Sequence, residues 1–392
     1  MSSPSRVAHT TDILHIIFSH ISDGKDLTSL LCTSPLFFGI IAPKLYRSLP
    51  ISNILNPLSG VDAGGRGGPY GKTKLLELVQ TVVVERAPLP DDDHWANWYK
   101  IPPLPAVETV IIHPADRNDR QDGGLDRTLP NKVVIQRLCP TATRLHISTP
   151  WSTPGASGVE SIPFLPCVET LVVKANAGEI NDLKYAVGNL HHWSWGRGQV
   201  ERPYRKIKAL HILVWGDLVY PEAILQSSDW GKDCVDELAI MELTRSTNAK
   251  LDDNLFHSLF HSLWESAERI GTGLIIDENV CLWLYNADTV LKRLSEWSKS
   301  RKVDDRKAMV ERALGEERKT FWQTGLEFYE AFGDLSVRDK TEEWYHSAVL
   351  APSPNLVSLR ARLAAKTKFP ADTFVGLTER EAEWTLANFS SN

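Results

Sequence analysis

The sequence predicts an α/β protein, in which a short helical module is followed by a repeat-type domain with a parallel sheet and a helical insertion. Three observations lead to this prediction. Short amphipathic helices with clear start and stop signals fill the first 50 residues. Short apolar strands then recur behind a similar lead-in. Between residues 252 and 334 the apolar positions follow the 3.6-residue period of a helix instead.

The composition is that of an ordinary globular protein. Of the 392 residues, 42% are hydrophobic and 23% are charged, which argues against disorder and leaves room for two or three domains. The formal net charge of −6 gives no basic footprint of the kind that nucleic-acid-binding proteins carry. We therefore expect no nucleic acid among the partners.

The cysteines and the hydropathy indicate the compartment. The five cysteines lie far apart without a Cys-x-x-Cys pair, which is typical of reduced thiols rather than a disulfide framework or a zinc site. The polar stretch Met1 to Thr11 lacks the apolar core of a signal peptide. No apolar run reaches the roughly 18 residues of a membrane span. We expect no membrane partner and a cytoplasmic or nuclear location.

The first predicted helix begins near Asp12. Its apolar residues at positions 13, 14, 17, 18 and 21 fall on one helical face. Thr10, Thr11 and Asp12 provide N-cap oxygens and a negative charge for the first turn. Gly24 is suited to a left-handed cap that ends this helix.

Two more short helices follow. The second is expected to begin near Asp26, with leucines at positions 27, 30 and 31. Ser34-Pro35 predicts the start of the third, with Ser as N-cap and Pro as the first helical residue. Pro43 is expected to interrupt it before Leu45. Helices this short do not persist alone in water, so they must pack on each other.

These residues resemble an F-box of the fungal type. The resemblance rests on Asp12 to Ser19, Lys25-Asp26-Leu27, Ser34 to Phe37 and Leu45 to Ser48, and it covers residues 8–50. It implies a three-helix unit that docks onto the Skp-family adaptor of a cullin-based ubiquitin ligase, while the rest of the chain holds a target. The adaptor-binding residues that the resemblance implies are Asp12, Ile13, Ile16, Ile17, Leu27, Leu31, Leu36 and Phe37.

The sequence departs from the F-box pattern at two places. His9 and Thr10 stand where F-boxes commonly have Leu-Pro, and the segment Cys32 to Phe37 lacks the usual arginine. Both departures concern affinity for the adaptor rather than the fold. The alternative interpretation is that residues 8–50 form a helical cap on the following domain.

Residues 51–392 carry the repeats. Leu104 to Ile112 is nearly repeated by Leu165 to Val173, both with Leu-Pro-x-Val-Glu-Thr. Weaker copies lie at 79–84, 139–147, 207–214, 235–240 and 273–276. Starts roughly 25 to 40 residues apart are typical of a stacked solenoid. The pattern resembles irregular leucine-rich repeats, without their regular Asn or Cys position. A chance recurrence in an ordinary α/β domain is the alternative.

The remaining segments are assigned from local pattern. Gly60 to Gly71 contains six glycines and is expected to be a loop. The stretch 252–334 is expected to be mostly helical, with exposed, densely charged residues at 299–319. A last strand is expected at 356–359 and a short helix after Thr378.

No complete catalytic, cofactor or metal site is found. Gly71-Lys72-Thr73 ends like a phosphate-binding loop, but Arg66 takes the position of a required glycine. His257 and His261 have the spacing of a zinc protease, but Ser258 replaces the catalytic glutamate. We therefore predict a non-catalytic protein. Six tryptophans in predicted loops are candidate interface anchors: Trp95, Trp98, Trp151, Trp193, Trp195 and Trp230.

Three functions remain from the sequence. The first is an F-box substrate receptor that holds a protein target near the ligase, so that proximity is its mechanism. The second is a repeat-type protein-binding scaffold without ligase engagement. The third is an enzyme on an α/β fold, which no complete site supports. The sequence does not identify the target.

Overall fold

In the computed structural model, the chain is described in separate stretches and forms two compact units. The described residues are 11–21, 23–52, 57–59, 61, 71–84, 100–112, 132–148, 163, 165–176, 183, 187, 206–215, 259–271, 276–297, 303–332, 351–367, 374, 377 and 379–388. The first unit comprises residues 1–146, 160–168 and 202–205, and the second comprises 147–159, 169–201 and 206–392.

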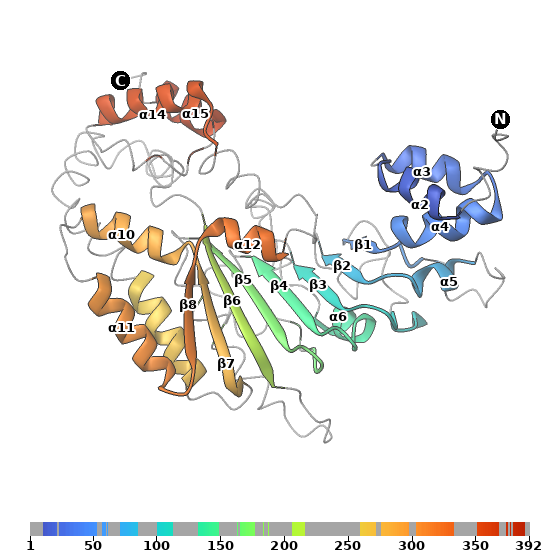
Figure 1. The fold of residues 1–392 in the computed structure, drawn as a ribbon, viewed down its shortest axis with the longest axis horizontal. Coiled ribbons are helices and arrows are strands. Elements are labelled where there is room, and N and C mark those ends of the chain that lie inside the picture. Colours follow the sequence, from blue (N-terminus) through green and yellow to red (C-terminus); the bar gives the residue numbers. More distant parts are fainter. Residues whose placement is uncertain are drawn as a thin grey trace, which may run out of the picture. The chain divides into compact units, whose positions relative to one another are not determined.

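Eight strands form one sheet in the order in which they occur in the chain (Figure 1). Their bounds are β1 (Ser48–Ile51), β2 (Thr81–Val84), β3 (Thr109–Ile112), β4 (Arg144–Ser148), β5 (Thr170–Asn176), β6 (Ile207–Trp215), β7 (Ile276–Tyr285) and β8 (Lys319–Gln323). Each of the five strand pairs with a described register is parallel. The predicted α/β class with a parallel sheet is confirmed. The order contains no reversal of the kind that defines a doubly wound sheet.

Helices precede, separate and follow the strands. In the first unit they are α2 (Thr11–Ser19), α3 (Gly24–Leu31), α4 (Pro35–Leu45), α5 (Lys72–Leu76) and α6 (Lys132–Leu138). In the second unit they are a helix at 259–271, α10 (Ala287–Trp297), α11 (Val303–Leu314), α12 (Gly325–Phe332), α14 (Pro354–Thr367) and α15 (Glu379–Asn388). None of these described helices has the length and apolar content needed to cross a membrane.

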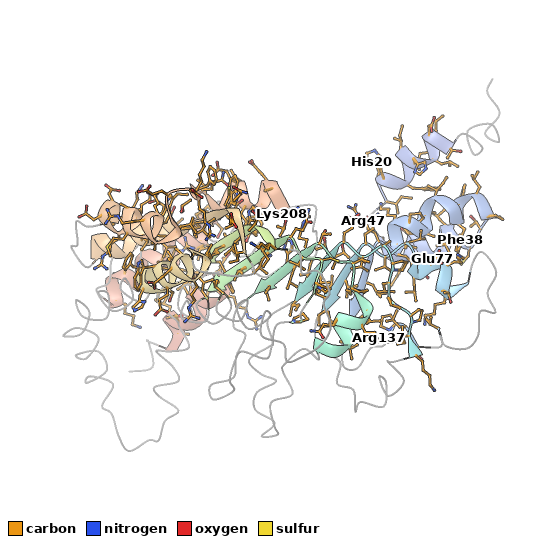
Figure 2. The ribbon with its side chains drawn as sticks, turned by 90° about the horizontal axis from the view of Figure 1, so that it is seen from below. His20, Phe38, Arg47, Glu77, Arg137 and Lys208 are labelled. Atoms are coloured by element: carbon orange, nitrogen blue, oxygen red, sulfur yellow. The ribbon has the colours of Figure 1, made fainter. Side chains whose placement is uncertain are left out.

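The strands are entered through one recurring backbone contact. A carbonyl just before one strand accepts hydrogen bonds from two consecutive amides at the entrance to the next. The carbonyls that do so belong to Arg47, Gln80, Glu108 and Glu169, and Figure 2 labels Arg47 before β1. Because neighbouring strands begin at the same level, equivalent residues pair directly, as Ser48 does with Thr81 and Thr81 with Thr109.

The two similar sequence phrases fold in the same way. Leu104 and Val107 are buried before β3, and Leu165 and Val168 are buried before β5. Each pair therefore anchors the turn that leads into a strand. The spacing between equivalent strand positions matches the recurrence seen in the sequence, except between β6 and β7, where Ala209 pairs with Cys281.

The helix start signals near the N-terminus work partly as predicted. Ser34 caps α4, because its side-chain oxygen accepts a hydrogen bond from the Phe37 amide at 3.2 Å. Asp23 caps α3 through the Lys25 amide at 2.7 Å. The expected left-handed cap at Gly24 is wrong, since Gly24 is the first residue of α3. The expected break at Pro43 is also wrong, because α4 continues through it.

In the second unit a buried asparagine joins the ends of three strands. Asn286 follows β7 with a left-handed backbone φ of 60°, which asparagine tolerates better than most residues. Its side-chain amide donates to the carbonyl of Val214 at 2.9 Å. Its backbone amide donates to the carbonyl of Gln323 at 2.8 Å. The residue thereby ties β6 and β8 to the turn between β7 and α10.

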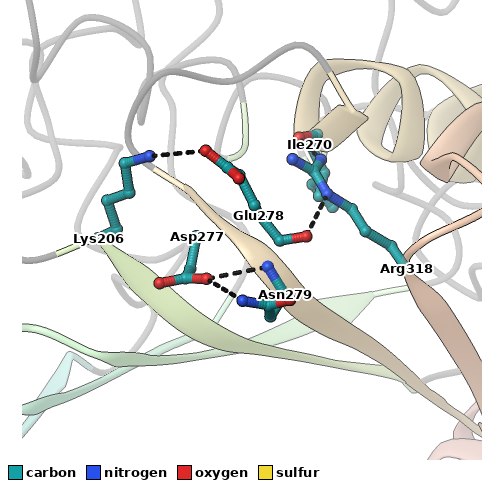
Figure 3. A network of polar contacts seen from close by, with 6 residues as sticks. All are labelled: Lys206, Ile270, Asp277, Glu278, Asn279 and Arg318. Atoms are coloured by element: carbon teal, nitrogen blue, oxygen red, sulfur yellow. Dashed lines mark hydrogen bonds and ion pairs between the residues drawn. The ribbon is translucent and has the colours of Figure 1, made fainter.

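At the opposite end of β7, Arg318, the residue before β8, joins this strand to a helix. Its guanidinium donates to the backbone carbonyl of Glu278 at 3.2 Å and to that of Ile270, near the end of the helix at 259–271 (Figure 3). The cation thus satisfies a helix-terminal carbonyl. Gly315 ends α11 with a φ of 102°, a conformation that suits glycine.

Several predictions for the C-terminal half need correction or remain untested. The stretch 252–334 contains helices, but also two strands. The first, β7, begins at Ile276, the last residue of the strand expected at 273–276, whose other residues lie outside the described part of the chain. The second, β8, was not expected from the sequence. The strand expected at 356–359 is wrong, because these residues lie inside α14. That helix and α15 share a core of their own, in which Leu363 and Phe374 are buried. The strand expected at 235–240 lies outside the described residues.

We predict that Gly271→Ala destabilises the second unit. A Cβ at position 271 would lie 2.7 Å from the backbone carbonyl oxygen of Ala313, so the chain has to shift at a cost of about 1–3 kcal/mol. Gly39→Ala in α4 is the matched control. No atom lies within 4 Å of its added Cβ, and alanine gains up to about 1 kcal/mol in a helix. Urea denaturation of both variants checks this, and equal stabilisation would contradict it.

Candidate functional site

The three N-terminal helices fold around a small apolar core. Leu14 and Phe18 of α2, Leu27 of α3 and Ile41 of α4 are buried together. The ring of Phe18 meets that of Phe37 edge to face, with centroids 5.0 Å apart. Because each helix contributes to this core, the three helices form one module, seen at the blue end of the chain in Figure 1.

Helix α2 has a second apolar side that this core does not cover. Ile13, Ile16 and Ile17 are 40%, 62% and 44% exposed. Their i, i+3 and i+4 spacing places them next to each other on the helix surface. We call these three residues the isoleucine patch. Burial of such a side chain by a partner yields up to about 1.5–3 kcal/mol, so the patch is suited to protein docking.

Leu36 adds a fourth exposed apolar side chain to the same module. It lies in the first turn of α4 and is 36% exposed. Among the described residues, only Met309, Leu326 and Val357 are further large apolar side chains with comparable exposure. These three lie on three separate helices of the second unit. The N-terminal module therefore holds most of the exposed large apolar side chains in the described chain.

The eight residues predicted to bind an adaptor fall into three groups. Asp12, the isoleucine patch and Leu36 are exposed. Leu31 and Phe37 are half-buried and pack against the module core. Leu27 is 3% exposed and belongs to the core, so its side chain supports the helices instead of facing a partner. His9 and Thr10 lie outside the described residues.

Lys44 is a positioning residue that the sequence did not reveal. Its ammonium group donates hydrogen bonds to the carbonyls of Phe18 at 2.8 Å and Ile21 at 2.6 Å. A cation at the C-terminal end of α2 also interacts favourably with the helix dipole. Lys44 belongs to α4, so this contact fixes α2, and with it the isoleucine patch, relative to α4.

The side chains considered for chemistry have other roles where they are described. The ammonium of Lys72, in the phosphate-loop-like segment, donates to the carbonyl of Ser59 at 2.5 Å. His261 is exposed and lies 3.4 Å from a Glu265 carboxylate oxygen; His257 lies outside the described residues. Burial raises the pKa of the Cys139 thiol, which disfavours the reactive thiolate.

The metal-site and tryptophan predictions have different outcomes. Within the described residues, no group of three or more His, Cys, Asp or Glu side chains could hold a metal ion. The six tryptophans suggested as interface anchors lie outside the described residues. The isoleucine patch is therefore the best-defined candidate site, and it is a surface for binding rather than for bond chemistry.

We predict that Lys44→Met lowers the stability of the N-terminal module by about 1–2 kcal/mol, since hydrogen bonds from a charged donor are lost. Lys25→Met is the control, because the exposed side chain of Lys25 carries no comparable contact to a helix end. Hydrogen exchange of the α2 amides measures the effect. Equal protection of α2 in both variants would show that Lys44 does not position this helix.

Comparisons with known proteins return no relative for this chain. No family model matches it, no curated protein is significantly similar, and no solved structure shares its fold at a significant level.

Proposed function

We propose that this protein is the substrate-recognition subunit of a cullin-based ubiquitin ligase. In this role the N-terminal helices dock the Skp-family adaptor, and the following domain, an irregular solenoid of the leucine-rich-repeat type, holds a protein target. The chain performs no bond chemistry. It raises the effective concentration of the target near the ubiquitin-carrying enzyme by tethering both.

The observation that carries the proposal is the division of α2 into two apolar sides. One side, with Leu14 and Phe18, is buried in the module core. The other side, the isoleucine patch, stays exposed although its residues are as apolar as those of the core. Contiguous exposed apolar side chains mark interaction sites more often than scattered ones do. The F-box-like segments of the sequence indicate that the partner is the Skp-family adaptor.

The arrangement of the sheet supports the second half of the proposal. Strands that follow each other in chain order, run parallel and share one entrance contact are typical of stacked repeats. Such repeats leave one face of the sheet available along its length. A target can therefore be held on a surface that belongs to the part of the chain beyond the helical module.

A second function is favoured by the first residues of the motif. His9 and Thr10 replace the Leu-Pro pair that opens most F-boxes. A chain that has lost this pair is suited to act as a repeat-type scaffold that binds a target without the ligase. Restoration of the pair distinguishes the two functions: if only His9→Leu/Thr10→Pro binds the adaptor, the natural chain is a scaffold.

We predict that Ile16→Asp lowers adaptor affinity about 100-fold or more, because a carboxylate would be buried without a partner. Val357→Asp is the matched control, because Val357 is 52% exposed on α14, a helix outside the N-terminal module. The adaptor affinity of this variant should stay within about twofold of that of the unsubstituted chain. Calorimetric titration with purified adaptor measures both. The proposal is wrong if Ile16→Asp binds the adaptor as tightly as the unsubstituted chain does. It is also wrong if the unsubstituted chain and the chain with Leu and Pro restored at positions 9 and 10 both fail to bind the adaptor.

A further inference from the structure

The isoleucine patch continues into a histidine at the end of α2. His20 follows the last residue of this helix, and Figure 2 labels it there. Its amide donates to the carbonyl of Ile17 at 3.2 Å, the i to i−3 contact of a tightened last turn. In such a turn the side chains at i and i+3 lie in line. His20 therefore lies next to Ile17 on the helix surface, one turn beyond Ile16.

The imidazole of His20 has no role inside the module. The residue is exposed, as Ile16 and Ile17 are. Among the residues that the structure describes, no hydrogen bond, ion pair or ring contact involves this side chain. The module core therefore does not depend on it, and a substitution at this position tests contact with a partner rather than folding.

His15 offers a comparison on the same helix. It is also exposed, and its side chain likewise has no such contact with the described residues. It lies one residue from Ile16 and two from Ile13 and Ile17. Residues one or two apart do not face each other on a helix. One exposed histidine of α2 thus borders the isoleucine patch, and the other points elsewhere.

A cation is fixed at the same end of α2. The ammonium of Lys44 donates to the carbonyls of Phe18 at 2.8 Å, Ser19 at 3.4 Å and Ile21 at 2.6 Å, on either side of His20 in the chain. An ammonium has three N–H donors, so these carbonyls use all of them. Lys44 therefore needs no acidic group from a partner, and it already occupies the helix end that favours a cation.

No acidic group of the module pairs with His20. The other titratable or charged side chains of the three helices and their caps are Asp12, His15, Asp23, Lys25, Asp26, Cys32, Lys44 and Tyr46. Asp23 is the closest of the carboxylates in the chain, and it caps α3 by accepting from the Lys25 amide at 2.7 Å. No carboxylate of the described residues forms an ion pair with the imidazole. Apolar side chains and Lys44 thus dominate its surroundings.

We infer that His20 is a specificity-determining residue of the docking surface, which the adaptor buries in the uncharged state together with the isoleucine patch. That the partner is the adaptor rests on the proposed function. A neutral imidazole adds apolar area and retains one N–H donor and one acceptor. An imidazolium buried between isoleucines and an ammonium would be costly, since neither stabilises its charge. The surface therefore selects a partner with an uncharged hydrogen-bonding group opposite His20, rather than a carboxylate.

Calorimetric titration of the whole chain with purified adaptor tests this inference. His20→Leu keeps position 20 uncharged, so the affinity should stay within about threefold of that of the unsubstituted chain. His20→Arg introduces a permanent cation and should weaken binding about tenfold or more. His15→Arg is the matched control, because it introduces the same charge away from the patch, and its affinity should stay within about twofold. Circular dichroism checks the folding of each variant.

The pH dependence separates charge from size, because arginine is also larger than histidine. An imidazole gains its charge as the pH falls from about 8 to about 5. If the adaptor binds the uncharged form, affinity is complete at the upper end of this range and is lost towards the lower end. The unsubstituted chain and His15→Leu should therefore lose about threefold more affinity than His20→Leu between about pH 7.5 and about pH 5.5. Titration of the adaptor itself is common to all three.

Three results would overturn the inference. They are an equal loss of affinity towards acid in the unsubstituted chain and His20→Leu, tighter binding of the unsubstituted chain at acid pH, and full affinity of His20→Arg. If only the chain with Leu and Pro restored at positions 9 and 10 binds the adaptor, the same variants are compared in that background. Failure of the proposed function is a different result, in which neither chain binds the adaptor at any pH, and this inference is then wrong as well.

Discussion

The rest of the structure depends on how each strand begins beside its predecessor. A single carbonyl before one strand accepts two amides of the next, as Glu108 does for Thr143 and Arg144. This contact sets the level at which β2, β3, β4 and β6 enter the sheet beside their predecessors, so the parallel register of these strands follows from it. A lone strand with its connecting segment cannot bury its apolar side. Each strand and its connecting segment are therefore stabilised by pairing with the next strand.

The two faces of the sheet in the second unit carry different kinds of side chain. In the second unit, the covered face is built from aliphatic residues such as Leu282 and Leu284. The opposite face carries the stacked rings of His211, Trp283 and Phe321 instead. The division of this sheet into an aliphatic side and an aromatic side parallels the two apolar sides of α2, one buried in the module core and one exposed.

The electrostatic contacts of the second unit fix geometry more than they add stability. Asp288 lies between Lys292 and Lys307, at 2.8 Å and 2.7 Å. Partial burial alone would raise the pKa of this carboxyl, but the two lysine contacts outweigh burial and lower it. Lys307 belongs to α11 and Asp288 to α10, so the pair orients two helices. Burial, with a smaller contribution from Glu327, raises the pKa of Tyr285 to about 12, which keeps its hydroxyl protonated beside His211.

The sequence by itself determined the features that depend on neighbours within a few residues. Ser34-Pro35 marked the start of α4, and the Leu-Pro-x-Val-Glu-Thr phrases marked the entrances to β3 and β5, because capping and turn chemistry are local. Only the tertiary structure decided which isoleucines of α2 remain exposed, that β7 extends to Tyr285, that β8 is a strand, and that Lys44 holds α2. These outcomes depend on partners far away in the chain, which periodicity within one segment does not contain.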